Sequence, residues 1–449
     1  METKKKGFPV AFWVCSCSEI FERLAYYLGR SLILIFVTAS VATGGLGLSD
    51  TVAANMQSNL TAFSYLLPLF GAVIVDKYIG ARYTTPVGMF IAAAGYFTGG
   101  IAKSATGVYV MIFLVSLGLA LFKNGAIIGR VITDKSQMDP AFSMRYTLVN
   151  VGAFIGTFLV GILYKDVFAK DGVLGFAPCF KMAALMMVLG GLWYIFVCWR
   201  FLGDLGKLPF KKTLTEEEKA AEAKKKEEAG TKQPLTTIEK KRIGAIFVAS
   251  LFSIVFWIFW YLGYMPVYFY WAENMDWVVA GYQVPSTWFD AANSLFCVIL
   301  GPVTAALWKK LAARPQGDMS LFRKTGLGIA IIGVVYLFNA AIDIMRGGEK
   351  ASVLWLIVFA FLLTMGEMFF SPLGHSFISK YSPSRYLAVM MSVWGFATFI
   401  AAKSYGPVYG LLFGGKIEFK VACIGVAVVS FAAALIMIAL DKKLSALVD

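Results

Sequence analysis

The sequence has little of the chemistry on which most enzymes and metalloproteins depend. It contains one histidine and six cysteines among 449 residues. The cysteines are scattered, mostly within apolar runs, and show neither metal-site spacing nor a disulfide framework. These residues are Cys15, Cys17, Cys179, Cys198, Cys297 and Cys423. Because we also find no nucleophile–base pair and no phosphate loop, we expect no enzyme, no metal and no cofactor.

Charged residues are scarce as well. Only 15% of the residues are charged, whereas 59% are hydrophobic, phenylalanine alone numbers 38, and the mean hydropathy is +0.71. Soluble domains rarely reach such values. The net charge of +14 could suggest nucleic-acid binding, but the basic residues lie in short clusters between apolar stretches. We therefore expect a membrane protein whose partner is the lipid bilayer and not nucleic acid.

About twelve stretches of 18 or more mostly apolar residues follow one another along the chain, which predicts an all-α protein with about 12 transmembrane helices. They lie near 9–39, 51–75, 83–102, 107–129, 145–164, 178–200, 242–270, 286–308, 325–345, 351–379, 387–412 and 420–440. The basic residues 1–6 precede a long apolar stretch that carries charges and has no small-residue cleavage site, which argues against a cleaved signal peptide.

The distribution of Lys and Arg predicts the orientation. If the N-terminus is cytoplasmic, the inside loops hold about twice as many basic residues as the outside loops even without the long central loop, and Arg145 is among these inside residues. We therefore expect a multi-pass protein of the plasma or bacterial inner membrane with both termini in the cytoplasm. We expect it to be a monomer.

A charged segment divides the spans six and six. Alternating acidic and basic blocks with alanine fill residues 201–241 and favour a solvated helix. We predict an N-terminal six-helix bundle at 1–200, a cytoplasmic linker at 201–241 and a C-terminal six-helix bundle at 242–449. Two halves joined in this way are the plan of the major facilitator fold, in which substrate binds between the halves. The loop after the second span, with Gly71, Asp76, Gly80 and Arg82, is typical of that superfamily, although a generic membrane turn is the alternative.

The first span carries an unusual polar face. Glu19, Glu22, Arg23, Tyr26 and Arg30 fall within roughly 100° of one another on a helix. Each charge near the bilayer centre costs about 3 kcal/mol. This face must therefore meet partner charges or a water-filled cavity. The alternative is a buried ion-pair cluster that only holds helices together.

The same span carries a family resemblance. The run Glu19-x-x-Glu22-Arg23-x-x-Tyr26-Tyr27 resembles the E-x-x-E-R-F-x-Y-Y signature of proton-dependent oligopeptide transporters. Further similarities follow in order at Tyr65, Leu121 to Asn124, Tyr146 to Gly152, Val284 to Asn293, Glu367 to Lys380 and Met390 to Trp394. The resemblance implies a major facilitator fold and proton-coupled symport of di- and tripeptides or similar zwitterions by alternating access.

Several positions depart from the family pattern. Leu24 replaces the usual phenylalanine, and Asn124 stands where the family prefers proline after the lysine. Tyr261 and Leu262 occupy the span-seven positions of an acidic residue and a glutamine. In the family that acid pairs with the arginine that matches Arg30. We therefore hypothesise that Tyr261 caps Arg30 and that coupling is altered.

The resemblance and the chemistry of a zwitterion together suggest site residues. A substrate carboxylate needs a cation, for which Arg23 and Lys123 are candidates, and a substrate amine needs an anion, for which Glu367 is the candidate. Asn150 and Asn293 would hydrogen-bond peptide groups. The remaining substrate-binding candidates are aromatic and would shape the pocket; they are Tyr26, Tyr27, Tyr65 and Trp394.

Proton coupling requires a carboxylate whose proton affinity differs between two states. Glu19 and Glu22, together with Arg23, Arg30 and Lys123, are the candidates. Structural alternatives remain for several residues: Lys123 could extend to the membrane surface, Glu367 could join two helices, and the asparagines could link helices.

Two other functions stay open. The chain could carry a non-peptide organic solute, such as an amino-acid conjugate or other organic anion. It could also be a membrane sensor that has a transporter fold but moves no substrate. The span-seven departure supports both alternatives.

Overall fold

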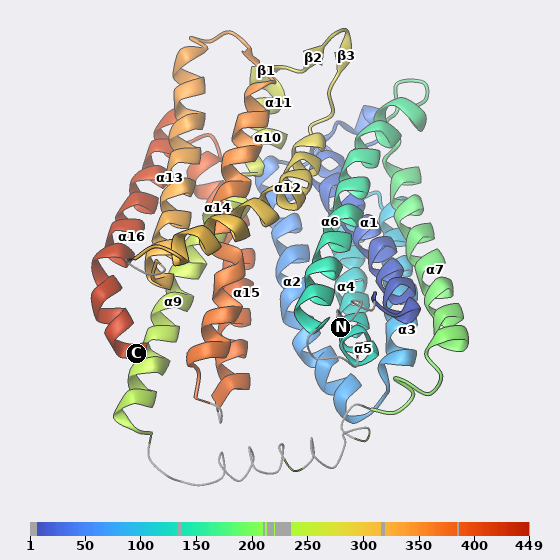
Figure 1. The fold of residues 1–449 in the computed structure, drawn as a ribbon. Coiled ribbons are helices and arrows are strands. Elements are labelled where there is room, and N and C mark those ends of the chain that lie inside the picture. Colours follow the sequence, from blue (N-terminus) through green and yellow to red (C-terminus); the bar gives the residue numbers. More distant parts are fainter. Residues whose placement is uncertain are drawn as a thin grey trace. The chain divides into compact units, whose positions relative to one another are not determined.

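The computed structural model describes residues 7–132, 137–209, 212, 220, 235–315, 319–383 and 386–448. The chain divides into two compact units (Figure 1). Unit 1 comprises Met1–Ser49 and Leu66–Leu214, and unit 2 comprises Asp50–Tyr65 and Thr215–Asp449. The boundary passes through one helix, α2 (Asp50–Lys77), whose first part packs with the later helices. The predicted bounds of the two bundles stay a prediction, and most of the 201–241 linker lies outside the described residues.

Unit 1 is built from long helices that pack side by side. Besides the second part of α2, its elements are α1 (Val10–Thr38), η1 (Val41–Thr43), α3 (Ala81–Ile101), α4 (Ala105–Leu121), α5 (Asn124–Val131), α6 (Met138–Ile162), η3 (Leu163–Val167) and α7 (Phe176–Phe201). Helix α1 packs against α6 and α7, and α3 packs against α4 and α7. Phe12, Ile128 and Tyr194 belong to a buried apolar core at one end of this unit.

Unit 2 repeats this plan with a small cap of strands. Its helices are α9 (Thr237–Leu262), α10 (Met265–Tyr268), α11 (Tyr270–Asn274), α12 (Trp288–Ala312), α13 (Leu321–Met345), α14 (Trp355–Tyr381), α15 (Leu387–Phe413) and α16 (Phe419–Val448). Strand β1 (Met275–Asp276) pairs in parallel with β4 (Ala351–Ser352), and β2 (Val278–Val279) pairs antiparallel with β3 (Tyr282–Gln283). Thr236 and Glu239 form a capping box that starts α9 directly after the charged segment.

The twelve predicted spans all coincide with helices, but the seventh is divided between α9 and α10, and the fourth is also interrupted. The predicted span 107–129 is divided between α4 and α5, because the chain leaves the helix at Phe122 and Lys123. There the Lys123 backbone N–H donates to the Thr85 hydroxyl at 3.3 Å. The side-chain amide of buried Asn124, the residue that replaces the family proline, donates to the carbonyl of Cys15 at 2.8 Å. Polar groups at the break thus find partners on other helices, the Thr85 hydroxyl on α3 and the Cys15 carbonyl on α1.

The helices have the dimensions of membrane spans. Within the described residues, seven helical stretches are long and apolar enough to cross a bilayer by length and composition: Asp50–Lys77, Pro140–Val167, Phe176–Phe201, Thr237–Asn274, Trp288–Ala312, Leu321–Met345 and Phe419–Leu447. Helix α1 spans 29 residues but carries four charged side chains. Those charges mark the part of unit 1 in which a function is most expected.

The superfamily loop between α2 and α3 closes one end of unit 1. Arg82 donates to the carbonyl of Cys198 at 2.8 Å and to the carbonyl of Gly203. A cation is favourable at the carbonyl end of a helix, so Arg82 stabilises the end of α7. The charge of Arg82 is thus directed at backbone carbonyls.

Candidate functional site

The polar face of α1 lies inside unit 1 and is balanced in charge. Glu19 and Glu22 are each 1% exposed. Arg23 donates to Glu22 through both Nε and Nη2, each at 2.5 Å. Arg145, from α6, donates through Nε to Glu19 at 2.8 Å. Each of the two buried carboxylates thus meets a partly exposed guanidinium group, which offsets the cost of burying the carboxylates.

Two glycines bring α6 close enough to make this cluster. A side chain at Gly152 would approach the Ile20 carbonyl oxygen to 2.9 Å, and one at Gly156 would overlap the carbonyl of Leu24. Glycines four residues apart are typical of membrane helices whose backbones touch. The Gly152–Gly156 pair therefore fixes the distance between α1 and α6, and with it the reach of Arg145.

Aromatic rings extend the cluster along α1. The Arg23 guanidinium carbon lies 4.9 Å from the Tyr26 ring centroid, and that of Arg30 lies 6.0 Å from the Tyr27 ring centroid. Tyr26 and Tyr27 meet edge to face at 5.3 Å. Arg30 is 5% exposed. Cation–π contacts of this kind are favourable in desolvated sites, so the rings help to hold both arginines.

Lys123 and Asn150 are engaged by backbone groups. The Lys123 ammonium donates to the Pro68 carbonyl of α2 at 2.8 Å. Asn150 donates to the Tyr146 carbonyl one turn earlier in α6 at 3.0 Å. Both side chains are partly accessible. Their predicted roles toward a substrate stay predictions.

The acidic candidate of unit 2 is surrounded by neutral groups. Glu367, in α14, is 9% exposed. Asn293, in α12, donates its side-chain amide to Glu367 at 3.2 Å and to the Thr364 hydroxyl at 2.8 Å. The Cys297 thiol lies 3.7 Å from the same carboxylate oxygen of Glu367. In the described part of the chain Glu367 has no ion-pair partner, so this acid can accept a cation from outside the protein or a proton.

The aromatic candidates of unit 2 form a packed wall. Trp394 is 6% exposed, covers Gly374 and lies 6.2 Å from Phe370. The Tyr261 hydroxyl donates to the Tyr65 hydroxyl at 3.0 Å. Tyr65 is 43% exposed and belongs, with the first part of α2, to unit 2. Trp394 and Tyr261 thus pack against other rings, and the predicted role of Trp394 toward a substrate stays a prediction.

Sequence reasoning missed Arg145 as a functional candidate. It counted this residue among the cytoplasmic loop cations, but Arg145 binds Glu19 from inside α6. Its position just before the Tyr146-x-x-x-Asn150-x-Gly152 run was the signal that could have found it. The described residues contain no group of three or more His, Cys, Asp or Glu side chains that could hold a metal.

Comparison with known proteins shows which family and which transporters the chain resembles. Residues 205–412 match the model of the POT family. The chain is 24% identical over 440 residues to a di-/tripeptide transporter of Lactococcus lactis subsp. cremoris, which covers 86% of each protein. The family model therefore matches slightly less than half of the chain, and the transporter from Lactococcus is similar along most of it. Its resemblance in sequence is therefore confirmed, and its relatives are transporters rather than enzymes.

Solved structures show the same fold. The crystal structure of a peptide transporter POT in complex with sulfate superposes with a TM-score of 0.86 at 23% identity, covering 99% of this chain and 98% of that one. A POT family transporter in complex with 5-aminolevulinic acid gives a TM-score of 0.85 at 23% identity and covers 98% of both chains. The predicted all-α major facilitator fold of a multi-pass membrane protein is thereby confirmed.

Proposed function

We propose that this chain is a proton-coupled symporter of di- and tripeptides or similar small zwitterions. The observation that carries the proposal is the pairing of buried Glu19 and Glu22 with Arg145 and Arg23 on the face that resembles the family signature. The relatives named as di-/tripeptide transporters support the substrate class. Protons are the proposed coupling ion, and no cofactor is required.

Each unit would bind one end of the substrate. Arg23 and Lys123 are the cations proposed for the substrate carboxylate, and Glu367 is the anion proposed for its amine. The support for Glu367 is its burial among the neutral partners Asn293, Thr364 and Cys297. A carboxylate in such surroundings gains more than a solvated one from binding an ammonium group.

Coupling would use a change of partners. Only interactions that differ between two states can drive a conformational change. In the described state Glu22 binds Arg23, so protonation of Glu22 would release that guanidinium for a substrate carboxylate. We propose this exchange as the link between proton and peptide movement. Both termini are proposed to lie in the cytoplasm, and the chain is proposed to act as a monomer.

Uptake into proteoliposomes tests the proposal. A panel of di- and tripeptides is supplied with and without an imposed inward proton gradient. We expect accumulation only with the gradient, and weaker binding of peptides whose C-terminus is amidated. Lys123→Ala should abolish the distinction between free and amidated forms. Equal affinity of the intact protein for both forms would refute the assignment of the carboxylate site.

A second candidate function is symport of a non-peptide organic solute. The absence of the family acid at Tyr261 and the neighbour that binds 5-aminolevulinic acid favour it. Including that compound in the uptake panel decides between the two. Counterflow of substrate, in turn, separates any transporter from a non-transporting sensor.

A further inference from the structure

Unit 2 contains a pocket of about 280 Å³ where α15 ends and α16 begins. Three separate parts of the chain line it: the first residue of α2, the α10–α11 segment, and the connection from α15 to α16. It lies apart from Glu367 and Asn293, neither of which lines it. Its volume is close to the lower end of the range of small-molecule sites, which is about 300 Å³.

The pocket has an aromatic floor. Phe269, Tyr409 and Phe419 line it and are each less than a tenth exposed. Their rings form a continuous series through Phe413: centroids are 5.2 Å apart from Phe269 to Tyr409, 5.9 Å from Tyr409 to Phe413 and 5.6 Å from Phe413 to Phe419. Aromatic faces attract cations and alkyl groups but repel anions.

The rim of the pocket is acidic. Asp50 and Glu273 line it and are exposed. The two carboxylates repel each other electrostatically, and the charge of Asp50 also reaches the Tyr409 hydroxyl. No lysine or arginine is among the lining residues, and within the described part of the chain neither carboxylate has an ion-pair partner. The charged residues that line the pocket are therefore both anionic, which favours a cationic ligand.

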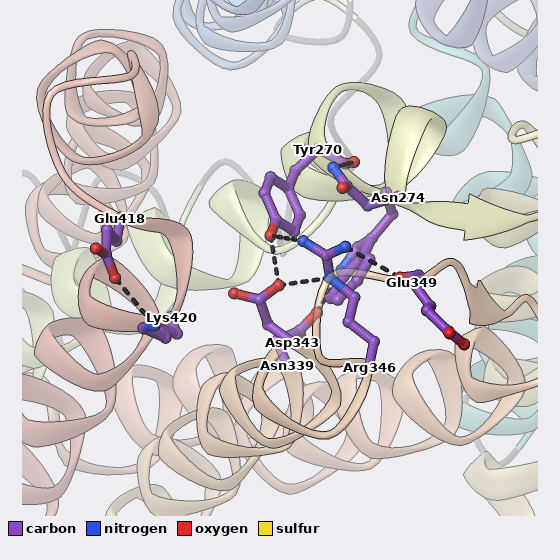
Figure 2. Close-up of polar contacts among 9 residues, drawn as sticks. Tyr270, Asn274, Asn339, Asp343, Arg346, Glu349, Glu418 and Lys420 are labelled. Carbon is purple, nitrogen blue, oxygen red and sulfur yellow. Dashed lines mark hydrogen bonds and ion pairs between the residues drawn. The ribbon is translucent and has the colours of Figure 1, made fainter.

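A polar network holds one wall in place. Figure 2 shows the Tyr270 hydroxyl between Asp343 and Arg346. The hydroxyl donates a hydrogen bond to Asp343 and accepts one from Arg346 at 2.7 Å. Arg346 also binds Asp343 at 2.7 Å, and the Tyr270 ring stacks on Phe419 at 3.7 Å. Arg346 is thus committed to Asp343 and Tyr270. A wall fixed in this way lowers the ordering cost of binding.

We propose that this pocket is a binding site for an organic ammonium ion. Its aromatic floor would enclose the alkyl part, and Asp50 and Glu273 would take the charge. The site itself stands independently of the transport proposal. The identity of the ligand rests on the proposed function. In the predicted orientation the pocket faces the outside of the cell, and the free amino end of an incoming peptide is an organic ammonium group.

Isothermal titration of the full-length protein tests the site. The probes are n-butylammonium and tetramethylammonium chloride, with sodium butyrate as the anionic counterpart. We expect both ammonium ions to bind and butyrate not to bind. The double variant Asp50→Asn/Glu273→Gln should weaken ammonium binding at least about tenfold, since two charged contacts are lost. Glu418→Gln is the matched control, because Glu418 is an exposed carboxylate paired with Lys420 outside the pocket (Figure 2).

A second variant addresses the aromatic part of the site. Phe413→Leu keeps apolar volume but removes a ring face, and we expect about threefold weaker binding of tetramethylammonium. Unchanged ammonium binding in the double carboxylate variant, or binding of butyrate as tight as that of butylammonium, would overturn the proposal.

Two arms separate this site from the candidate transport site and identify the ligand's source. In Glu367→Gln, ammonium binding should persist; loss there, with no effect of Asp50 and Glu273, would assign the binding to Glu367 instead. Alanylalanine should compete with butylammonium and N-acetyl-alanylalanine should not. If the protein moves no peptide but ammonium binding still depends on Asp50 and Glu273, the transport proposal fails while the pocket proposal holds.

Discussion

In unit 1 the buried carboxylates Glu19 and Glu22 are each paired with an arginine, whereas in unit 2 Glu367, one of several buried carboxylates, is held by an amide and a thiol. The first arrangement is complete without a ligand. The second lacks a cation in the part of the chain that the structure describes. The difference indicates separate tasks: unit 1 can exchange partners and protons internally, and unit 2 offers an anion to something that arrives from outside.

The largest expected effect separates these tasks by neutralising one acid at a time. Glu22→Gln keeps shape and hydrogen bonding but removes the proton site. We expect gradient-driven accumulation to be lost while counterflow of unlabelled against labelled peptide survives. Glu367→Gln should instead weaken peptide binding, and counterflow should fall with it. The measurements are uptake with and without a proton gradient, and counterflow, for both variants in parallel.

The comparison would fail if both variants behaved alike. Persistent accumulation at the wild-type level in Glu22→Gln would show that Glu22 is not essential for coupling, and Glu19 would become the better candidate. Unchanged peptide affinity in Glu367→Gln would remove the proposed role of this acid.

The sequence predicted most of the fold, for a clear physical reason. A span must be long and apolar, and this requirement is local, so all twelve spans were located within a few residues. The break at Lys123 was not predicted, because it depends on Thr85 and Cys15, which belong to other helices. The polar face of α1 was recognised from its periodicity alone.

The site was predicted less completely, because partners across helices leave no periodic signal. Arg145 looked like a loop cation, since its partner Glu19 lies 126 positions away in sequence. Nothing in the sequence indicated the pocket where α15 ends and α16 begins. Its walls come from Asp50, from the α10–α11 segment and from the α15–α16 connection, which are brought together only by folding.

The next largest effect concerns stability in unit 1. Arg145→Met leaves Glu19 buried without its cation. Because Arg145 is 31% exposed in its side chain, we expect a cost near the lower end for a broken buried pair, about 3 kcal/mol. Thermal unfolding in detergent measures this. In a Glu19→Gln background the same substitution should cost little, and an equal loss in both backgrounds would show that Arg145 stabilises the unit by other contacts.

A smaller loss of stability is expected when the contact between α1 and α6, which positions Glu19 and Arg145, is disturbed. Gly156→Ala would place a methyl group against the Leu24 carbonyl of α1, which has no flexible end to move aside. Overpacking of this kind costs about 2 kcal/mol. Gly244→Ala is the matched control, since nothing lies within 4 Å of that position in α9. There the helix gains about 1 kcal/mol in intrinsic propensity. Equal changes in melting temperature for the two variants would argue against a tight α1–α6 contact.

The smallest expected effect tests the departure from the family in span seven. Tyr261 is 4% exposed, its ring lies 5.2 Å from Tyr405, and its hydroxyl donates to Tyr65. Tyr261→Phe removes the hydrogen bond to Tyr65, whose net value is about 1 kcal/mol, and should leave uptake close to that of the wild type.

Tyr261→Glu sharpens the same comparison, because it returns an acid to the position at which the family carries one. If Tyr261 caps Arg30 as we hypothesise, the new carboxylate should form an ion pair with Arg30 and favour one conformational state of the transporter. Substrate exchange should then slow, or the pH optimum of uptake should shift. These effects should disappear in Arg30→Ala. The measurement is uptake against pH for the two single variants and the double variant, from which the coupling energy follows. The same effect of Tyr261→Glu with and without Arg30 would show that the positions are independent. The tyrosine would then act within unit 2, where it contacts Tyr65, Tyr405 and Trp260. The contrast between the paired carboxylates of unit 1 and Glu367 in unit 2 would then need no contribution from span seven.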